Sequence, residues 1–341
     1  MKTMAGLAWA SRRNVLLAGL AAMLLLPAFS NPYTLFVGTL LLIYVILALG
    51  LNLLVGYAGQ LAFANAAMFG IGAYTCGLLQ VKLGVSYWAA LPAGALLAMA
   101  VGSAMAFPAL RLSGLYLALA TLAFAQFTQW VLLNWETVTF GAGGFKVPEV
   151  SFAWLGLKSH MGVYYLALLL AVGLYAAARN IVRSGIGRAL VAIRDGEVAA
   201  ESLGIDLLRY KATAFALSGF YAGVAGGLYC AAINFVAPEG YDLFQMVLQK
   251  AMVVVGGIGS VVGSVLGATL LVLLLEGLRA FKSTQEIVFG ALLLGFVIFM
   301  PEGVVSLLKR HLPGWDEPLR RTGGDEPAAA SPPAAETEPA E

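Results

Sequence analysis

Long apolar stretches recur along most of the chain and are separated by short polar segments. A helix needs about 20 apolar residues to cross the roughly 30 Å hydrocarbon core of a bilayer. Stretches of this kind lie at residues 14–30, 34–55, 86–108, 114–133, 162–180, 212–236 and 287–305. We predict one crossing helix in each of them.

Two further apolar stretches, residues 57–81 and 243–277, are interrupted by glycines and polar side chains. This pattern is typical of a helix whose backbone is broken inside the membrane. We predict one crossing in the first stretch and two in the second. The fold class is therefore all-α, a polytopic membrane helix bundle of about ten crossings.

The crossings divide evenly around residue 161, so the second half would begin on the opposite side of the membrane from the first. That is the arrangement of an inverted repeat. Each half also contains one glycine-broken segment, residues 56–60 and residues 256–260, at roughly corresponding places. An inverted repeat is therefore a prediction of this pattern.

The composition agrees with a membrane protein, because 60% of the 341 residues are hydrophobic and only 11% are charged. A net charge of +2 is too small to indicate a nucleic-acid partner. Lys and Arg accumulate in short cytoplasmic loops. An N-terminus inside the cell places most of the 20 basic residues there: Lys2, Arg12, Arg13, Arg111, Arg179, Arg183, Arg188, Arg194, Arg209, Lys211, Lys309, Arg310, Arg320 and Arg321. Both termini are thus predicted to be cytoplasmic.

The two ends of the chain differ from the rest. Residues 1–30 are either a retained first helix, which we expect, or a cleaved signal peptide, because Arg12 and Arg13 precede an apolar run that ends Ala28-Phe29-Ser30. Residues 309–341 are rich in Pro, Ala and Glu and have no apolar period, which predicts a disordered cytoplasmic tail. The transmembrane domain is accordingly predicted to span residues 1–308.

Several chemistries are excluded by what the sequence lacks. Cys76 and Cys230 lie inside apolar runs, so neither a disulfide framework nor a zinc site is expected. No G-x-x-x-x-G-K-[ST] segment is present to hold ATP phosphates, and His160 and His311 are not placed for a catalytic triad. We therefore expect no enzyme activity and no cofactor in this chain, so that any ATP must be hydrolysed by another polypeptide.

Ionisable groups inside the membrane are functional candidates by default. Lys250 is one, and we expect it to extend toward the cytoplasm or to cap exposed carbonyl groups. Glu276 is the other, and it is expected at the outer interface beside Arg279. A proton-coupled carrier needs a carboxylate near the midplane, and none is evident.

Glycines recur every four residues in two places, and such small faces let helices approach closely in lipid. We expect them to pack inside the bundle. The two sets are Gly219, Gly223 and Gly227, and Gly259, Gly263 and Gly267.

The polar segment 181–211 is too long to be a simple turn. Asp195 can cap a short helix, Ala199, Ala200 and Leu203 then share one face, and Gly204 can end it. We predict a short amphipathic helix on the cytoplasmic side. It is either a connector held at lipid head groups or, as its small face favours, an element that enters a groove of a partner protein.

This segment resembles the coupling loop of ABC importer permeases, Glu-Ala-Ala-x-x-x-Gly, through which the permease docks on its ATPase. Ala199, Ala200 and Gly204 match that spacing, whereas Val198 stands at the glutamate position and Glu197 lies one place early. The longer run from residue 183 to 211 resembles the form found in branched-chain (hydrophobic) amino-acid permeases. Agreement extends to residues 59–61, 70–74, 110–118, 255–260, 263, 267 and 301–303.

The resemblance implies a permease subunit of an ATP-driven importer of branched-chain amino acids, working by alternating access in a bacterial inner membrane. Its implied partners are a second homologous permease, two cytoplasmic ATPase subunits, a periplasmic substrate-binding protein and the lipid. The residues implied in coupling to the ATPase are Arg188, Glu197, Ala199, Ala200 and Gly204. We expect Arg188 and Arg194 to contribute less than the small residues, because exposed charge pairs are individually weak.

Other readings stay open. Ala62, Ala64 and Asn65 stand where the family often has Ser, Gly and His, so the cargo could be urea or a short amide. A stand-alone secondary transporter and a non-transporting scaffold are further alternatives. A zwitterionic cargo needs donors for its carboxylate, which a helix N-terminus beside a glycine break can supply. The candidate pathway residues are Gln60, Phe63, Asn65, Tyr74, Gly257 and Ser260, although close helix packing would equally explain these glycines.

Overall fold

The structure is a computed structural model that describes residues 31–152, 158–279, 285–300 and 303–306, together with residues 23, 24, 27 and 156. Most of the crossing predicted at 14–30 and the tail predicted at 309–341 lie outside the described residues.

Helices account for nearly all of the described chain, which confirms the predicted all-α bundle. Seven are long and apolar enough to cross a membrane: α2 (Pro32–Asn52) with the π-helical turn η1 (Leu53–Tyr57), α3 (Asn65–Leu83), α4 (Tyr87–Ala104) with α5 (Ala106–Arg111), α6 (Gly114–Asn134), α8 (Ser159–Arg183), α11 (Leu207–Ile233) and α13 (Val261–Leu278). Two shorter apolar helices, α12 (Leu243–Gly256) and α14 (Gln285–Phe299), complete the set. Each crossing predicted within the described residues therefore has a helix, and the count of about ten is approximate.

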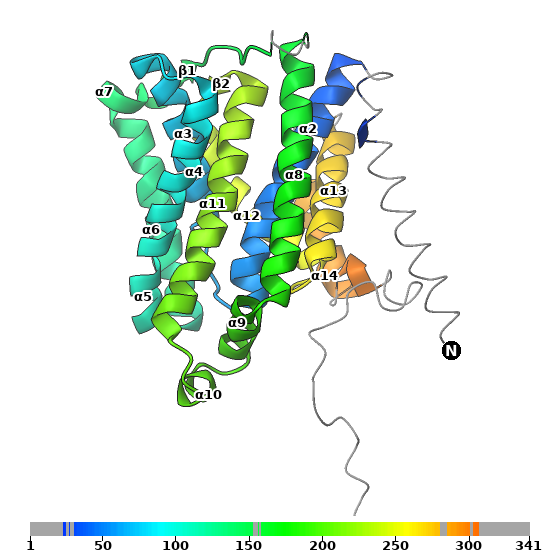
Figure 1. The fold of residues 1–341 in the computed structure, drawn as a ribbon. Helices are drawn as coiled ribbons and strands as arrows, with labels where there is room; N and C mark the ends of the chain where they lie inside the picture. The colour runs from blue at the N-terminus through cyan, green and yellow to red at the C-terminus, as the bar shows by residue number, and fades with distance from the viewer. Residues whose placement is uncertain are drawn as a thin grey trace, which may run out of the picture.

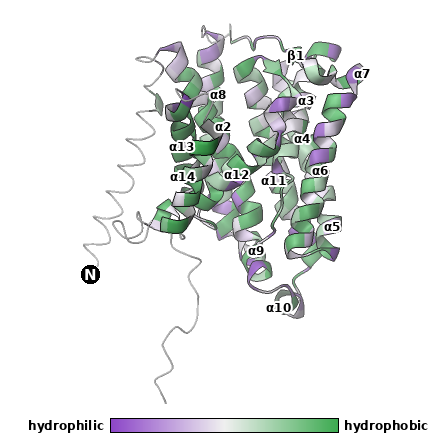
Figure 2. Cartoon of the chain, turned by 180° about the vertical axis from the view of Figure 1, so that it is seen from behind, coloured by the Kyte–Doolittle hydropathy of each residue, from purple (hydrophilic) through white to green (hydrophobic). Residues whose placement is uncertain are grey.

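The long helices run side by side, and small elements close the two ends of the bundle (Figure 1). One end, called here the sheet end, carries α7 (Glu136–Thr139), η2 (Gly141–Gly143), η4 (Pro238–Tyr241) and the strands β1 (Phe145–Lys146) and β2 (Phe235–Val236). The strands pair antiparallel with Phe145 opposite Val236. The other end, called the α9–α10 end, carries α9 (Gly185–Asp195) and α10 (Glu197–Ser202). Most residues of the helices between the two ends are hydrophobic (Figure 2).

Both predicted helix interruptions are present. After η1 the chain is non-helical until α3 begins at Asn65, and α12 ends at Gly256 before a turn that leads into α13. Gly59 (φ +68°), Gly257 (φ +120°) and Gly259 (φ +76°) adopt backbone conformations that residues with a side chain rarely adopt. The 14 residues of α12 span about 21 Å, which is less than the hydrocarbon core, so α12 crosses only part of it.

The two interruptions differ in their place in the helix order. The first precedes α3, whereas the second follows α12. α3 and α12 nevertheless run antiparallel. Asn65, at the start of α3, forms a hydrogen bond with Gln249 in the middle of α12. Tyr74, further along α3, packs against Tyr241, which precedes α12. Opposite directions of this kind are what an inverted repeat requires.

The glycines of α11 let this helix pack closely against α3 and α4. A Cβ atom on Gly219 would lie 2.5 Å from the Ala98 carbonyl oxygen, and one on Gly223 would lie 2.8 Å from Ala95 Cα. On α3, a Cβ atom on Gly72 would lie 2.5 Å from Gly223 Cα. The absence of side chains therefore lets α3, α4 and α11 touch backbone to backbone, as predicted for glycines that pack inside the bundle.

We predict that Gly72→Ala destabilises the protein, because the added methyl group would meet the Gly223 backbone. The cost should be about 1–3 kcal/mol, the usual penalty of overpacking. Gly173→Ala is the matched control, since it lies in helix α8 with nothing within 4 Å of the new Cβ. The control should be neutral or slightly stabilising, because alanine favours helix more than glycine does. Apparent melting temperatures in detergent would compare the two, and equal melting temperatures would contradict the packing described here.

Candidate functional site

The two interrupted segments lie against each other, and Asn52 joins them. Its side-chain amide nitrogen donates to the Ser260 carbonyl oxygen and to Ser264 Oγ, both at 2.7 Å. Its amide oxygen accepts from the Gly259 N–H at 2.9 Å. Gly56 lies so close to this turn that a Cβ atom on it would be 2.5 Å from Gly259 N. A buried asparagine therefore satisfies the backbone of one interruption from the helix that leads into the other.

Arg194, near the end of α9, reaches the same place. Its Nη1 donates to the Gly56 carbonyl oxygen at 3.0 Å, and the ideal Cβ position of Gly259 is 3.4 Å from that nitrogen. Gly59 packs on the stem of this side chain, since a Cβ atom there would lie 2.6 Å from Arg194 Cγ. Arg194 also pairs with Asp195 at 3.0 Å. Besides forming a surface ion pair, Arg194 therefore attaches α9 to both interrupted segments.

The helix α9 is an element that the sequence analysis did not predict. The Ser184 side chain caps its start by accepting from the Ile186 N–H at 3.2 Å. Leu190 and Ile193 are buried on its inner face, whereas Arg188 is exposed. The prediction that Asp195 caps the next helix is wrong, because Asp195 is the last residue of α9 and Gly196 precedes α10.

The predicted stop at Gly204 is confirmed. Gly204 has φ +81°, its N–H donates to the Glu201 carbonyl at 2.9 Å, and the Ile205 N–H donates to the Ala200 carbonyl at 3.1 Å. These two bonds are the Schellman pattern that ends a helix.

The predicted small face of this segment differs in one respect. Ala200 is 1% exposed and faces the bundle, so it does not share a surface with Ala199 and Leu203. Val198 and Leu203 are 84% and 79% exposed, and Ala199 is exposed between them. These three residues, called here the α10 patch, form an apolar surface at the tip of the molecule.

Glu197 anchors α10 to the bundle. Its Oε1 lies 2.7 Å from Lys211 Nζ, and that buried ammonium also donates to the Ala109 carbonyl oxygen at 3.0 Å. Gln60 donates to the same carboxylate at 3.4 Å. Glu197 therefore ties α10 to α11, to α5 and to the first interrupted segment.

The predicted pathway residues lie at three levels rather than around one pocket. Gln60, Gly257 and Ser260 belong to the contacts at the α9–α10 end described above. Phe63 and Asn65 lie deeper in the bundle, beside Lys250 and Gln249 of α12.

Tyr74 is nearer the sheet end, where its ring packs edge-on against Phe145 and Tyr241. Glu276 pairs with Arg279 at 3.6 Å, as the sequence analysis predicted.

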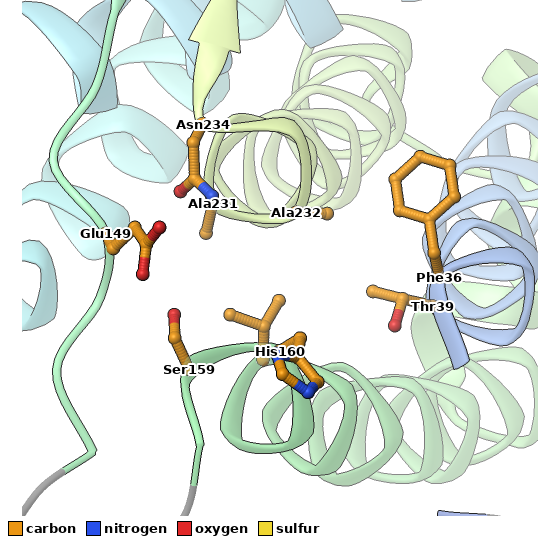
Figure 3. Close-up of a pocket in the computed structure, with 9 residues that line it drawn as sticks. Phe36, Thr39, Glu149, Ser159, His160, Ala231, Ala232 and Asn234 are labelled. Atoms are coloured by element: carbon orange, nitrogen blue, oxygen red, sulfur yellow. The ribbon is translucent and has the colours of Figure 1, made fainter. Parts of the chain in front are cut away.

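Two cavities in the described part of the chain can be compared with the predicted pathway residues. One, of about 300 Å³, lies between α3, α4 and α6 and is almost entirely apolar; its lining is Ile71, Tyr74, Thr75, Leu78, Val101, Phe124, Phe127, Thr128, Val131, Leu132, Trp135, Val138 and Thr139. The other, of about 100 Å³, lies toward the sheet end (Figure 3) and contains Glu149, Ser159, His160 and Asn234. Ligand pockets usually measure about 300–1,000 Å³, so the first has the volume for a small apolar group and the second does not.

Comparison with known proteins identifies relatives over most of the chain. Residues 33–297 match the family described as branched-chain amino acid transport system / permease component. The chain is 35% identical over 300 residues to the high-affinity branched-chain amino acid transport system permease protein LivM of Escherichia coli (strain K12), covering 81% of this chain and 71% of LivM.

More distant relatives are also transport permeases. The permease protein LivH of the high-affinity branched-chain amino acid transport system of Salmonella typhimurium (strain LT2) is 27% identical over 289 residues, 77% of this chain and 91% of LivH. The ribose import permease protein RbsC of Escherichia coli (strain K12) is 28% identical over 240 residues, 69% of this chain and 71% of RbsC. No solved structure matches the chain.

The joint at Asn52 gives a second prediction. Asn52→Ala removes three hydrogen bonds and leaves the Gly259 N–H and Ser264 Oγ without this partner, so stability should fall by about 1–3 kcal/mol. Asn134→Ala is the control, because the exposed Asn134 bonds only to the Trp130 carbonyl of its own helix, and it should change stability by no more than about 0.5 kcal/mol. Thermal unfolding in detergent would measure both, and amide exchange should rise at residues 257–264 in the first variant alone. Unchanged exchange there would show that Asn52 does not hold the turn.

Proposed function

Because this chain belongs to the family of branched-chain amino acid transport system permeases, we propose that it is the membrane permease subunit of an ATP-driven importer of branched-chain or similar hydrophobic amino acids. The observation that carries the proposal is the similarity to LivM, which extends over most of both chains. The long helices, the interrupted segments and the segment α9–α10 lie almost entirely within residues 33–297, which match the family.

ATP would be bound and hydrolysed by partner subunits, since the sequence has no P-loop segment. The α10 patch supports docking of such a partner. Val198 and Leu203 are exposed on α10 and directly after it, at the tip of the molecule and beyond the ends of the long helices (Figure 1). Exposed apolar groups of this kind are typical of a surface that another protein covers.

The contacts of Arg194, Asn52 and Glu197 suggest how a movement of the partner would reach the pathway. A shift of α9–α10 would pull on the Gly56 carbonyl through Arg194 and on the first interrupted segment through Glu197 and Gln60. Asn52 would pass the same displacement to the 257–260 turn. Alternating access would then follow from joint movement of the two interruptions, which directly precede α3 and α13.

The charges support an orientation with the α9–α10 end in the cytoplasm. Arg111, Arg188, Arg194, Arg209 and Lys211 lie at that end, and positive residues accumulate on the cytoplasmic side. ATPase subunits would dock there. A periplasmic substrate-binding protein would deliver cargo at the sheet end, and a second homologous permease would complete the membrane part in a bacterial inner membrane.

We predict that vesicles containing this chain with its partners import leucine only when ATP is supplied on the side of the α9–α10 end and binding protein on the other. Isoleucine and valine should compete, whereas aspartate and lysine should compete poorly because their extra charge must be desolvated. A non-hydrolysable ATP analogue is the control and should give no uptake.

Two results would change this proposal in different ways. Uptake driven by a proton or sodium gradient without the ATPase would contradict the importer mechanism. ATP-driven uptake of urea or a short amide, but not leucine, would leave the mechanism and correct the cargo.

A further inference from the structure

Lys250 is a positive charge inside the bundle and forms no ion pair with an acidic residue of the described part of the chain. It lies on α12, six residues before the Gly256 end, and is half-buried. Its Nζ is 3.3 Å from the centroid of the Phe63 ring. It takes part in no ion pair or hydrogen bond found among the described residues. A charge at membrane depth is costly, so a cation kept there without a counter-ion indicates a functional role.

The neighbouring residue carries a second unused donor. Gln249 is 1% exposed, and its amide nitrogen has no hydrogen-bond partner in the described part of the chain. Its amide oxygen accepts from Asn65 Nδ2 at 2.9 Å, and Asn65 in turn accepts from Ser218 Oγ at 3.1 Å. This chain of bonds holds the Gln249 amide beside the first residue of α3. A buried donor without a partner is costly and is rare in native proteins, so the site favours an acceptor that arrives from elsewhere.

The start of α3 adds to the same local charge. α3 begins at Asn65 inside the bundle, and no side chain caps its first turn. The N-terminus of a helix carries partial positive charge and favours an anion. The ammonium, the amide and the helix end thus bring three sources of positive potential to one level of the bundle, and the ion pairs found among the described residues place no carboxylate there.

A small apolar cluster borders this group. It consists of Ala66, Ala67, Ala125 and Met246, with Phe63, Leu122 and Phe124 packed against it. Met246 precedes Lys250 by four residues and therefore lies on the same face of α12. Positive donors on one side and short apolar side chains on the other suit a molecule that has a carboxylate and a small hydrophobic body.

We propose that Lys250 and the Gln249 amide, beside the uncapped start of α3, bind the carboxylate of the cargo amino acid as it passes through the membrane. The inference rests on the proposed function, because it assigns the cargo's carboxylate to this level of the pathway. Without cargo, the Phe63 ring holds the ammonium through its π face. A carboxylate is a stronger partner for an ammonium than an aromatic ring, so arriving cargo would draw Lys250 from Phe63.

The experiment measures leucine uptake and ATP hydrolysis together in vesicles that contain the complete importer. Lys250→Gln should lower the leucine imported per ATP by about tenfold or more, the value of one charge-assisted hydrogen bond. Lys250→Arg keeps the charge and should retain most of the ratio, and Gln249→Leu should lower it in the same direction as Lys250→Gln. Lys82→Met is the matched control, because Lys82 also lies over an aromatic ring, at 5.0 Å from the Phe140 centroid, but at the exposed end of α3.

The outcomes separate this inference from the proposed function. If the wild-type importer shows no ATP-driven uptake of any cargo, the proposed function fails. If it carries urea or a short amide but not leucine, the importer stands and the carboxylate site is overturned. The remaining outcomes apply when it carries leucine. If it does, and Lys250→Gln keeps the wild-type ratio of leucine to ATP, the carboxylate site is overturned while the importer stands.

Loss of the assembled complex, or an equal fall in uptake and hydrolysis in Lys250→Gln and Lys250→Arg, would assign Lys250 to a structural contact and would also overturn the inference.

Discussion

A break in a membrane helix exposes backbone groups that water does not reach, and the fold depends on how those groups are satisfied. Here two breaks are placed together so that one set of side chains serves both. Asn52, at the end of α2, forms hydrogen bonds with the Ser260 carbonyl oxygen and the Gly259 N–H of the 257–260 turn. Arg194, on α9, donates a hydrogen bond to the Gly56 carbonyl oxygen. The glycines at 56, 59 and 259 allow this, because side chains there would occupy the space of the neighbouring backbone or of Arg194. The contacts that stabilise the two breaks therefore also fix where the interrupted segments lie in the bundle.

This joint explains why a short segment at one end of the molecule can influence its interior. α9 is held by its buried apolar face and by Arg194, while α10 is held by the Glu197–Lys211 pair. The α10 patch is left uncovered at the tip. Above the joint, α3 and α12 run antiparallel and carry the Lys250 and Gln249 donors between them. A displacement at the tip would therefore act on Gly56 and Gln60, a few residues before Phe63, which lies at the level where we propose that cargo binds.

Much of this could be predicted from the sequence, because it depends on local patterns. The length of the apolar stretches predicted the crossings, and their glycine-rich interruptions predicted the broken helices. Gly204 predicted the end of α10, because glycine readily adopts the left-handed backbone found there. The contacts that define the site depend on residues far apart in sequence. Asn52 meets residues more than 200 positions away, and its only local signal is a polar side chain in an apolar stretch. Asp195 does not cap a helix because it is the last residue of α9, and the local signal for that helix is the recurrence of Ile186, Leu190 and Ile193 at helical spacing. The burial of Ala200 is set by how α10 rests on the bundle, which no periodicity of the segment itself reveals.

The central claim is that Arg194 transmits movement from α9–α10 to the interrupted helices. The most direct test compares Arg194→Ala with Arg209→Ala in the complete importer, because both arginines pair with a nearby aspartate but Arg194 also donates to the Gly56 carbonyl of the first interrupted segment. The account predicts that Arg194→Ala still hydrolyses ATP when loaded binding protein is added, but that the leucine imported per ATP falls by about tenfold, the size of a typical coupling between two sites. Arg209→Ala should keep the wild-type ratio. A wild-type ratio of leucine to ATP in Arg194→Ala would contradict the claim.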